Sequence, residues 1–398
     1  MTVHPLRGAA AIIGIGSAGL GAARGRSELD ITVEAALAAV RDAGLHLAEI
    51  DGVVTASMTA PMPVMRICEE LGLAPSWTDS TNIGGGSLLA HLLTAALALE
   101  AGICNAVLVC YGSTQRTGVR RSVITEYRNT VDPDAFELPY RPFNPPASYA
   151  LAAARHMHDF STTRRQLAEV AVAARHWAML NPDAFRRDPL SIEDVLAAPM
   201  VADPLGTRDC CLITDGAGAY VMVRAERAAD GPQKPVYLLG VGAAQTHRQI
   251  SAMPDLTTTG AAQSGPRAYE MAGLRPAEID VLQLYDAFTI TVLLFLEDLG
   301  FVPKGEAGRF VEDGAIAPGG KLAVNTNGGG LSCVHPGMYG VFLILEAVRQ
   351  LRGHAGARQI EGASTALCHG NGHVLSSQVT AILGNGDTLD RRSGGWRR

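Results

Sequence analysis

The sequence lacks the features that would place it in several specialised classes of protein. No stretch reaches the roughly 18 uninterrupted apolar residues that a membrane-spanning helix requires, and the apolar run 9–15 has the length of a strand, not the design of a signal peptide. The seven cysteines are an odd number, and none has the paired spacing of a zinc site. The formal net charge of -6 leaves no basic surplus for a nucleic-acid surface. We therefore expect a reduced, cytoplasmic protein with no membrane span, no metal and no nucleic-acid partner.

The composition is typical of an α/β protein. Of the 398 residues, 47% are hydrophobic, only 18% are charged and 44 are glycines, a balance that suits central strands covered by helices on both faces. The length is sufficient for two ordinary domains or for one large duplicated unit.

The chain repeats itself. Residues 43–51 (AGLHLAEID) recur as residues 272–280 (AGLRPAEID), with seven identities in nine positions, and each copy precedes a strand-like run, 52–55 or 281–284. Three further pairs of segments keep the same order along the chain: 12–16 with 238–242, 84–86 with 328–330, and 109–112 with 367–370. Four matches in one order predict two homologous halves, joined near the polar, turn-rich stretch 229–235.

Strands alternate with helical patterns in each half, which predicts a mainly parallel sheet. The apolar stripe after Gly86 predicts a long buried helix. The stretch from about 115 to 205, with helical patterns at 149–160 and 163–180, is interpreted as a cap over the active site. The predicted organisation is an N-terminal half over 1–230 that includes this cap, a C-terminal half over 235–386, and a flexible tail over 387–398.

A glycine pattern near the N-terminus is similar to a dinucleotide fingerprint. Gly14, Gly16 and Gly19 have the GxGxxG spacing, and part of the pattern recurs at Gly240 and Gly242, as a duplication demands. No acidic residue follows at the end of a second strand, where ribose binding would require one. We therefore expect no bound nucleotide cofactor.

Several motifs resemble the thiolase superfamily, and the likeness spans nearly the whole chain. Residues 325–340 (NTNGGGLSCVHPGMYG) are similar to its asparagine-glycine-glycine and His-Pro active-site loop, and residues 149–204 and 209–219 (DCCLITDGAGA) look like the sterol-carrier-protein-type thiolases. The resemblance implies the fold of that superfamily, in which two duplicated halves form a five-layered α-β-α-β-α sandwich. It also implies an acyl-CoA substrate, with coenzyme A as part of the substrate and no bound cofactor.

A thiolase needs a cysteine nucleophile at a helix N-terminus, and this chain has none there. Aligned on the helix that follows, the nucleophile position falls on Gly84, and Ser87 lies about one helical turn further on. Two further departures are Tyr285, within residues 284–288 (LYDAF), and Tyr339 in the His-Pro loop. Together these resemble the lipid-transfer-protein-like aldolases of steroid side-chain degradation. That resemblance implies a homodimeric lyase that cleaves a β-hydroxyacyl-CoA by retro-aldol chemistry and works with a small OB-fold partner.

The resemblance and the chemistry of each side chain together suggest roles for the motif residues. Tyr285 and Tyr339 are candidates for proton transfer at the substrate hydroxyl and at the enolate carbon, or else packing residues. His335 would hold the thioester oxygen, or else lock the glycine-rich loop. Asp286 would orient Tyr285 or bind backbone amides at the start of the following helix. Cys368 is a candidate second acid/base, or else a retained packing residue.

The glycine loop and the late cysteine motif supply the candidates for binding the acyl-CoA, which are Gly329, Gly330, His369 and Asn371. Two rival interpretations stay open. One is an acyl-transferring thiolase that uses Cys333 or Cys368 as its nucleophile. The other is a non-catalytic subunit that binds a lipid or coenzyme A in support of a partner enzyme.

Overall fold

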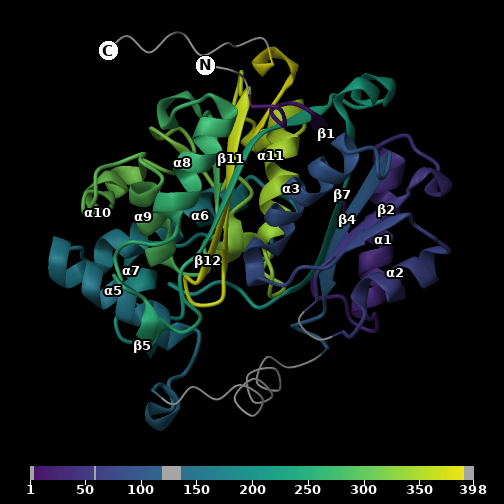
Figure 1. The fold of residues 1–398 in the computed structure, drawn as a ribbon. Coiled ribbons are helices and arrows are strands. Elements are labelled where there is room, and N and C mark those ends of the chain that lie inside the picture. Colours follow the sequence, from purple (N-terminus) through teal and green to yellow (C-terminus); the bar gives the residue numbers. More distant parts are fainter. Residues whose placement is uncertain (1–3, 58–59, 119–135, 390–398) are drawn as a thin grey trace.

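A computed structural model describes residues 4–57, 60–118 and 136–389 (Figure 1). Ten of its strands form one hydrogen-bonded sheet in the order β10-β9-β11-β12-β8-β1-β7-β4-β2-β3, and β5 and β6 pair separately. The strands are β1 (Ala10–Gly21), β2 (Gly52–Thr55), β3 (Trp77–Asp79), β4 (Ala106–Ser113), β5 (Met200–Ala202), β6 (Leu205–Gly206), β7 (Asp215–Arg224), β8 (Val236–Gln245), β9 (Val281–Leu284), β10 (Ala323–Val324), β11 (Thr365–Gly372) and β12 (Ser377–Gly384). The helices are α1 (Glu28–Asp42), α2 (Pro63–Leu71), α3 (Ser87–Glu100), α5 (Pro146–Phe160), α6 (Arg164–Met179), α7 (Ile192–Leu196), α8 (Ala261–Ala272), α9 (Thr289–Asp298), α10 (Ala307–Phe310) and α11 (Gly340–Arg352).

The two halves of the large sheet have the same strand order. From the outer edge inward, the first half runs β3-β2-β4-β7-β1 and the second half runs β10-β9-β11-β12-β8. The halves meet where β1 pairs with β8, with Ala11 opposite Tyr237 and Ile12 opposite Val236. The strand-like runs that follow the sequence repeat are β2 and β9, which occupy equivalent places. The duplication that the sequence predicts is therefore confirmed by the strand order.

The prediction of a mainly parallel sheet is wrong. Only the three outer strands of each half run parallel: β2 lies between β3 and β4, and β9 lies between β10 and β11. β12 follows β11 through a tight turn at 373–376 and is therefore antiparallel to it. β7 is the equivalent strand of the first half and is antiparallel to β4. The cap, which lies between β4 and β7, thus replaces a hairpin turn.

Helices cover the sheet in layers. α3 and α11 pack on each other and contact strands of both halves, whereas α1 packs on β1, β4 and β7, and α8 packs on β8 and β12. In Figure 1, α3 and α11 lie between the β11–β12 hairpin and the strands of the first half. This arrangement confirms the five layers. Leu88, Leu89 and Leu92 of α3 have no exposed surface, as expected for a helix enclosed by two layers of strands.

The glycines that are similar to a dinucleotide fingerprint allow helices to approach the strands closely. A Cβ atom on Gly14 or Gly16 would collide with the backbone of α1, and one on Gly240 or Gly242 would collide with the backbone of α8. Only glycine permits this spacing between strand and helix. The pattern therefore recurs in both halves because the same helix packing recurs.

One of the four sequence matches is not a structural equivalence. Gly84–Gly86 lead into α3, whereas residues 328–330 lead only into a single π-helical turn, Gly329–Cys333. The equivalent of α3 is α11, which begins at Gly340, after the His-Pro motif. A Cβ atom on Gly340 would collide with the backbone of Gly85, so the two central helices begin side by side.

The described part of the cap is largely helical. The predicted helices 149–160 and 163–180 correspond to α5 and α6. α6 begins with a capping box in which Thr163 and Gln166 each accept a hydrogen bond from the other's backbone. Residues 119–135 of the cap and residues 390–398 of the predicted tail lie outside the described residues. The start of that tail is attached, because Arg7 donates to the carbonyl oxygen of Thr388 at 2.7 Å.

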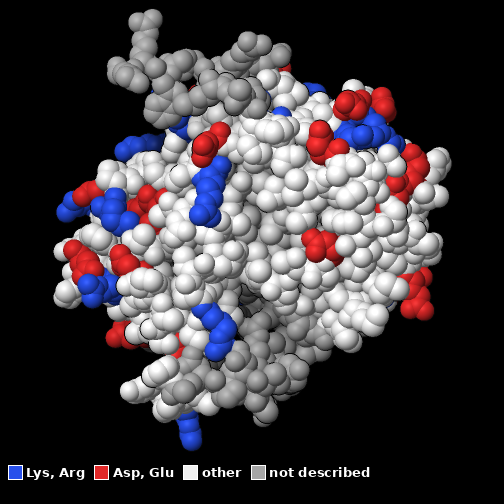
Figure 2. Space-filling view, viewed as in Figure 1, with Lys and Arg blue, Asp and Glu red and all other residues white. Residues whose placement is uncertain are grey.

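Figure 2 shows one face of the molecule, on which lysine, arginine, aspartate and glutamate side chains are interspersed around a largely uncharged centre. Within residues 4–57, 60–118 and 136–389, no helix has the length and the apolar character needed to cross a membrane.

Candidate active site

A cavity of about 700 Å³ lies where both halves and the cap meet. The turn before α3, the ends of β8 and β11, the segment after β9, the His-Pro loop and the start of α5 form its wall. The wall residues are Asn82, Ile83, Gly84, Gly85, Asn144, Pro145, Tyr149, Cys211, Gln245, Thr246, His247, Arg248, Gln249, Tyr285, Ala287, Phe288, His335, Gly337, Met338, Asn371, His373, Val374, Ser376 and Ser377. Three predicted site residues are among them, and the other six (Tyr339, Asp286, Cys368, Gly329, Gly330 and His369) are not.

Tyr285 directly follows β9 and presents a phenol to this cavity. Its hydroxyl donates to the carbonyl oxygen of Gly337 at 3.2 Å and accepts the backbone N–H of Tyr339 at 3.1 Å. Burial raises the pKa of Tyr285 well above its ordinary value of 10. The phenol therefore keeps its proton at neutral pH and is a proton donor in the resting site.

His335 and Tyr339 lie beside Tyr285. The ring of Tyr285 makes edge contacts with both, at centroid distances of 5.6 Å in each case, and the rings of His335 and Tyr339 stack at 6.1 Å. The backbone N–H of His335 donates to the hydroxyl of Thr214 at 2.9 Å, which fixes the loop. The hydroxyl of the fully buried Tyr339 donates to Asn327 Oδ1 at 3.1 Å. In this cluster Tyr285 and His335 line the cavity, and Tyr339 lies behind them.

The nucleophile position of a thiolase has no room for a side chain here. Gly84 has a φ of +78°, in the left-handed region, and a Cβ atom on it would lie 2.7 Å from the Cα of Gly372. A Cβ atom on Gly85 would collide with the ring of Tyr285. The hydroxyl of Ser87 donates to the carbonyl oxygen of Gly84 at 2.7 Å, which occupies it in the turn before α3. Gly85 thus leaves space for the tyrosine, whereas the space at Gly84 is taken by the backbone of Gly372.

Asp286 anchors the glycine loop. Its Oδ1 accepts the backbone N–H of Gly330 at 2.6 Å, and its Oδ2 accepts that of Leu331 at 3.2 Å. This corrects both predicted arrangements, because the amides belong to the π-helical turn and not to the helix that follows Asp286, and the carboxylate is used by that turn and not by Tyr285. Burial raises the pKa of Asp286 to about 7. Gly329 and Gly330 pack against this carboxylate, which explains why they do not line the cavity.

Cys368 and His369 occupy opposite faces of β11. The thiol of Cys368 donates to the carbonyl oxygen of Leu343 in α11 at 3.4 Å, and burial raises the pKa of that thiol far above its ordinary value. His369 is held between Thr380 and Gln378, at 2.9 Å from each, and burial lowers its pKa to about 3. Both residues are fully buried. Neither the acid/base role predicted for Cys368 nor the substrate contact predicted for His369 has the geometry it needs.

The cysteines of the rival acyltransferase interpretation do not line the cavity. The thiol of Cys333 accepts a hydrogen bond from Asn181 at 3.5 Å, and burial raises its pKa to about 12. Cys368 faces α11, as described above. The cysteine that does line the cavity is Cys211, in the segment that leads into β7.

Sequence reasoning missed the part of the wall that the cap supplies. Tyr149 of α5 stacks on Phe288 with ring centroids 4.3 Å apart, and its hydroxyl donates to the carbonyl oxygen of His373 at 2.8 Å. Asn371, which the sequence did single out, donates from Nδ2 to the Tyr149 hydroxyl at 2.6 Å. Tyr149 begins the stretch 149–204 that resembles the sterol-carrier-protein-type thiolases, but the one signal for the residue itself is a lone tyrosine in an alanine-rich helix. Its position depends on how the cap packs.

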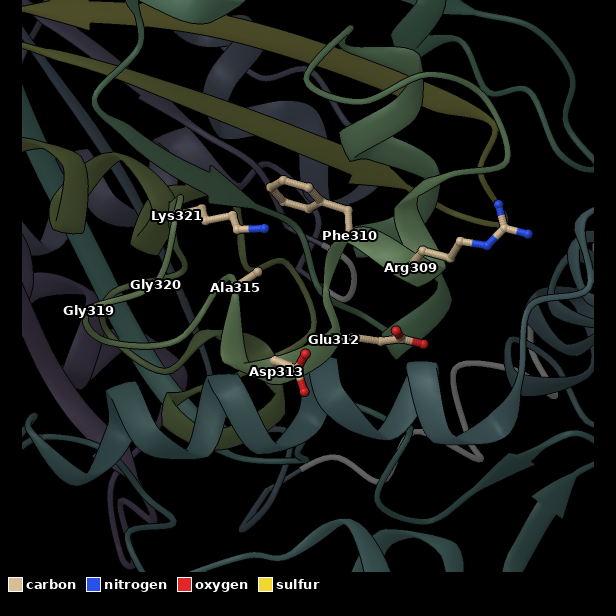
Figure 3. Close-up of a pocket in the computed structure, with 8 residues that line it drawn as sticks. All are labelled: Arg309, Phe310, Glu312, Asp313, Ala315, Gly319, Gly320 and Lys321. Atoms are coloured by element: carbon tan, nitrogen blue, oxygen red, sulfur yellow. The ribbon is translucent and has the colours of Figure 1, made fainter.

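A second hollow, of about 320 Å³, lies on the surface near α10 (Figure 3). Its side chains include Arg309, Lys321, Glu312 and Asp313, and in Figure 3 Arg309 points away from Lys321. Gln166 of α6 donates to Glu312 at 2.7 Å. This hollow contains none of the motif residues, so the larger cavity is the candidate active site. In the described part of the chain, no group of three or more histidines, cysteines or acidic residues is placed to hold a metal ion.

The chain matches one family model and is similar to known proteins over most of their length. The model described as "Thiolase C-terminal domain-like" matches residues 242–385. The chain is 35% identical to the 17-hydroxy-3-oxo-4-pregnene-20-carboxyl-CoA lyase of Mycobacterium tuberculosis, over 87% of this chain and 92% of that protein. It is 34% identical to an acetyl-CoA acetyltransferase of Methanothermobacter thermautotrophicus, over 94% of this chain and 98% of that protein. The solved Ltp2-ChsH2(DUF35) aldolase superposes with a TM-score of 0.87 and 33% identity, over 96% of this chain and 100% of that chain.

Proposed function

Because the chain belongs to the thiolase superfamily, we propose that it is a thiolase-fold lyase that cleaves a β-hydroxyacyl-CoA by retro-aldol chemistry, without a cysteine acyl-enzyme. Its relatives include both a CoA-ester lyase and an acetyltransferase, so membership alone does not separate the two reactions. The observation that carries the proposal is the closed turn at Gly84 and Gly85, against which the ring of Tyr285 packs. A thiolase forms its acyl-enzyme on a cysteine at the position of Gly84, where no side chain fits here.

The relative from Mycobacterium tuberculosis is, by its name, a lyase of a 17-hydroxy steroid 20-carboxyl-CoA. We propose a substrate of the same class, a branched or steroidal β-hydroxyacyl-CoA that brings coenzyme A as part of its own structure. No other cofactor is proposed. Tyr149, Phe288 and Met338 supply apolar surface to the cavity, which supports a hydrophobic acyl group.

In the proposed reaction a base takes the proton of the β-hydroxyl, and the oxygen forms the C=O bond of a ketone. The bond between Cα and Cβ breaks, and its electron pair passes into the thioester as an enolate. The enolate then takes a proton at Cα, so the products are a ketone and a shortened acyl-CoA with all atoms accounted for. Tyr285, which is protonated at rest, is assigned the proton transfer to Cα. Because the Tyr285 phenol keeps its proton, His335, its neighbour in the cavity wall, is assigned the proton of the β-hydroxyl in place of the thioester oxygen expected from the sequence.

The proposal extends to the partners and the location of the chain. The solved aldolase is named for two components, Ltp2 and ChsH2(DUF35). We propose that this chain also works with a DUF35 partner, that this partner is a small OB-fold protein, that the chain is a homodimer, and that the complex is cytoplasmic.

The test is carbon–carbon cleavage of a tertiary β-hydroxyacyl-CoA by the chain co-expressed with such a partner, followed as release of ketone and shortened acyl-CoA by mass spectrometry. Tyr285→Phe should lower the cleavage rate by about 10²-fold or more while acyl-CoA binding persists. Cys368→Ala and Cys333→Ala should leave cleavage unchanged. Thiolysis of acetoacetyl-CoA that disappears in a cysteine variant would instead establish an acyltransferase. Binding without any reaction would establish a non-catalytic subunit.

A further inference from the structure

Four buried polar side chains form a hydrogen-bonded row on one face of the β11–β12 hairpin. His369 and Asn371 of β11 lie opposite Thr380 and Gln378 of β12, respectively. His369 Nδ1 lies 2.9 Å from Thr380 Oγ1, and His369 Nε2 lies 2.9 Å from Gln378 Oε1. Gln378 Nε2 then donates to Asn371 Oδ1 at 2.9 Å. At most 2% of any of these residues is exposed, so water does not compete for the bonds.

These contacts fix the direction of every hydrogen bond in the row. The low pKa of His369 keeps its ring neutral, so that it carries a single N–H. Gln378 Nε2 donates to the backbone carbonyl oxygen of Leu375 at 3.1 Å, and because a carbonyl can only accept, Gln378 turns Oε1 toward His369. Oε1 is also only an acceptor, which places the His369 N–H on Nε2 and leaves Nδ1 to accept from the Thr380 hydroxyl. The Thr380 hydroxyl is within 2.8 Å of the hydroxyl of Ser264 in α8, which closes the row at its outer end.

The row determines how the carboxamide of Asn371 is turned. Because Gln378 Oε1 accepts the hydrogen bond from His369, Gln378 Nε2 faces Asn371. Asn371 must therefore direct Oδ1 at Gln378 and Nδ2 at the Tyr149 hydroxyl, 2.6 Å away. The Tyr149 proton is in turn donated to the carbonyl oxygen of His373. An asparagine amide can usually be placed in either sense, but here its neighbours permit only one.

The first half of the chain offers an internal comparison. By the equivalence of Cys110 and Cys368, His369 and Asn371 correspond to Tyr111 and Ser113 of β4. Their partners on β7 are both glycines, Gly218 and Gly216, where the second half has Thr380 and Gln378. The fold is therefore built in the first half without any such row. The strand arrangement that the two halves share therefore does not require the row, whose inner end, Asn371, lines the cavity.

We propose that Asn371 is a catalytic residue whose second side-chain N–H binds the thioester oxygen and stabilises the enolate, and that Gln378 and His369 are positioning residues that hold it in this orientation. The inference rests on the proposed retro-aldol function. Asn371 lines the cavity, and its backbone carbonyl oxygen and the ring of Tyr285 both border the space beside Gly85. In the described part of the chain, the Tyr149 hydroxyl is the one acceptor found for Asn371 Nδ2, which leaves one N–H for a ligand. A fixed neutral donor suits an oxygen whose charge develops only during the reaction.

The test of Asn371 uses the chain with its partner and the variant Asn371→Asp, which keeps the shape of the side chain and removes the N–H. Loss of one oxyanion donor typically costs about 10²- to 10³-fold in kcat, and we expect a fall of that size with little change in KM. A second readout needs no turnover. The wild type should bind propionyl-CoA more tightly than S-propyl-CoA, which lacks the carbonyl oxygen, and Asn371→Asp and Asn371→Ala should lose that preference.

The positioning residues are tested separately. Gln378→Glu keeps the acceptor for His369 and removes the N–H that orients Asn371, so kcat should fall at least tenfold while the affinity for coenzyme A alone persists. Thr380→Val removes the hydroxyl that donates to His369 and should lower kcat in the same direction.

Two results would overturn the inference. One is a rate within twofold of wild type in Asn371→Asp, and the other is an unchanged preference for propionyl-CoA over S-propyl-CoA in both Asn371 variants. If the wild type cleaves no thioester, the proposed function fails, and the binding comparison still decides the role of Asn371.

Discussion

The ring of Tyr285 lies in the space that a side chain on Gly85 would need. Its hydroxyl is held there by the carbonyl oxygen of Gly337 and the backbone N–H of Tyr339. A glycine before α3 and a tyrosine after β9 therefore depend on each other, although 200 residues separate them in the sequence. The nucleophile position itself, Gly84, is closed by a different contact, the backbone of Gly372 and His373.

Gly85→Ala should displace the Tyr285 ring from the cavity wall, and the added methyl would also lie 2.5 Å from the backbone carbonyl oxygen of Asn371. The added methyl would collide with the Tyr285 ring, which must move away from Gly337, so cleavage should fall at least tenfold and unfolding should become easier by about 1–3 kcal/mol. Gly86→Ala is the matched control, because its nearest neighbour would be a Val379 methyl at 3.2 Å. Cleavage rates and thermal unfolding of both variants are the measurements. Equal activity of the two alanine variants would contradict the dependence of Tyr285 on Gly85.

Gly84→Cys should not create a thiolase. The left-handed backbone and the Cα of Gly372 at 2.7 Å leave a cysteine there strained, so no acyl adduct should form with acetoacetyl-CoA, as read by mass spectrometry of the intact protein. Gly25 has a similar φ of +74° with nothing within 4 Å. Gly25→Ala therefore measures the backbone strain alone, about 1–2 kcal/mol, and Gly84→Ala should cost clearly more. A stable acyl adduct on the cysteine would show that the turn adapts to a nucleophile.

The sequence predicted the parts of this molecule that local patterns encode. The duplicated motif placed β2 and β9 correctly, and the His-Pro motif brought His335 to the cavity beside Tyr285. The prediction of site residues from the sequence failed where a residue's role depends on the direction in which its side chain points. Cys368 and His369 are adjacent in one motif, yet the thiol of Cys368 faces α11 and the ring of His369 is held by Thr380 and Gln378 of β12, so neither side chain lines the cavity.

The function of Asp286 was also beyond the sequence. Its carboxylate accepts a hydrogen bond from the backbone N–H of Gly330, which lies 44 residues away along the chain, and no local sequence spacing predicts this contact. The same holds for the cap, since Tyr149 reaches the cavity only through the packing of α5 on the second half.

Asp286 should make stability depend on pH around neutrality. Burial raises its pKa to about 7, against an unfolded value of about 3.9, so between these values the folded chain holds a proton that the unfolded chain has lost. The free energy of unfolding of the wild type should therefore fall as pH rises from about 4 to about 7. Measured against Asp286→Asn, the fall should be on the order of 3 kcal/mol. Above about pH 7 the difference in unfolding free energy between the two proteins should stay constant. Denaturant unfolding of both proteins from pH 4.5 to 8.5 is the measurement.

Asp280→Asn provides a control of the opposite sign. Burial alone would raise the pKa of Asp280, but hydrogen bonds from Ser364 and Thr365 lower it below its ordinary value. Its contribution to stability is therefore present above an unfolded pKa of about 3.9 and is lost only in stronger acid. Between pH 4.5 and 8.5 the stability difference between wild type and Asp280→Asn should stay nearly constant. A slope around pH 7 in that control would assign the transition to another group.

Tyr339→Phe separates the two tyrosines. The Tyr339 hydroxyl is fully buried and donates to Asn327, while its backbone N–H supports the Tyr285 phenol, and the substitution removes only the hydroxyl. Cleavage should therefore fall less than tenfold in Tyr339→Phe, against about 10²-fold or more in Tyr285→Phe, and the loss of a buried hydrogen bond should cost about 1 kcal/mol of stability. Single-turnover rates at saturating substrate are the measurement, since they isolate the chemical step. Equal losses of cleavage rate in the two variants would contradict this expectation. They would mean that the Tyr339 hydroxyl leaves Asn327 and reaches the substrate once the cavity is filled. Proton transfer would then have to be assigned to Tyr285 and Tyr339 together.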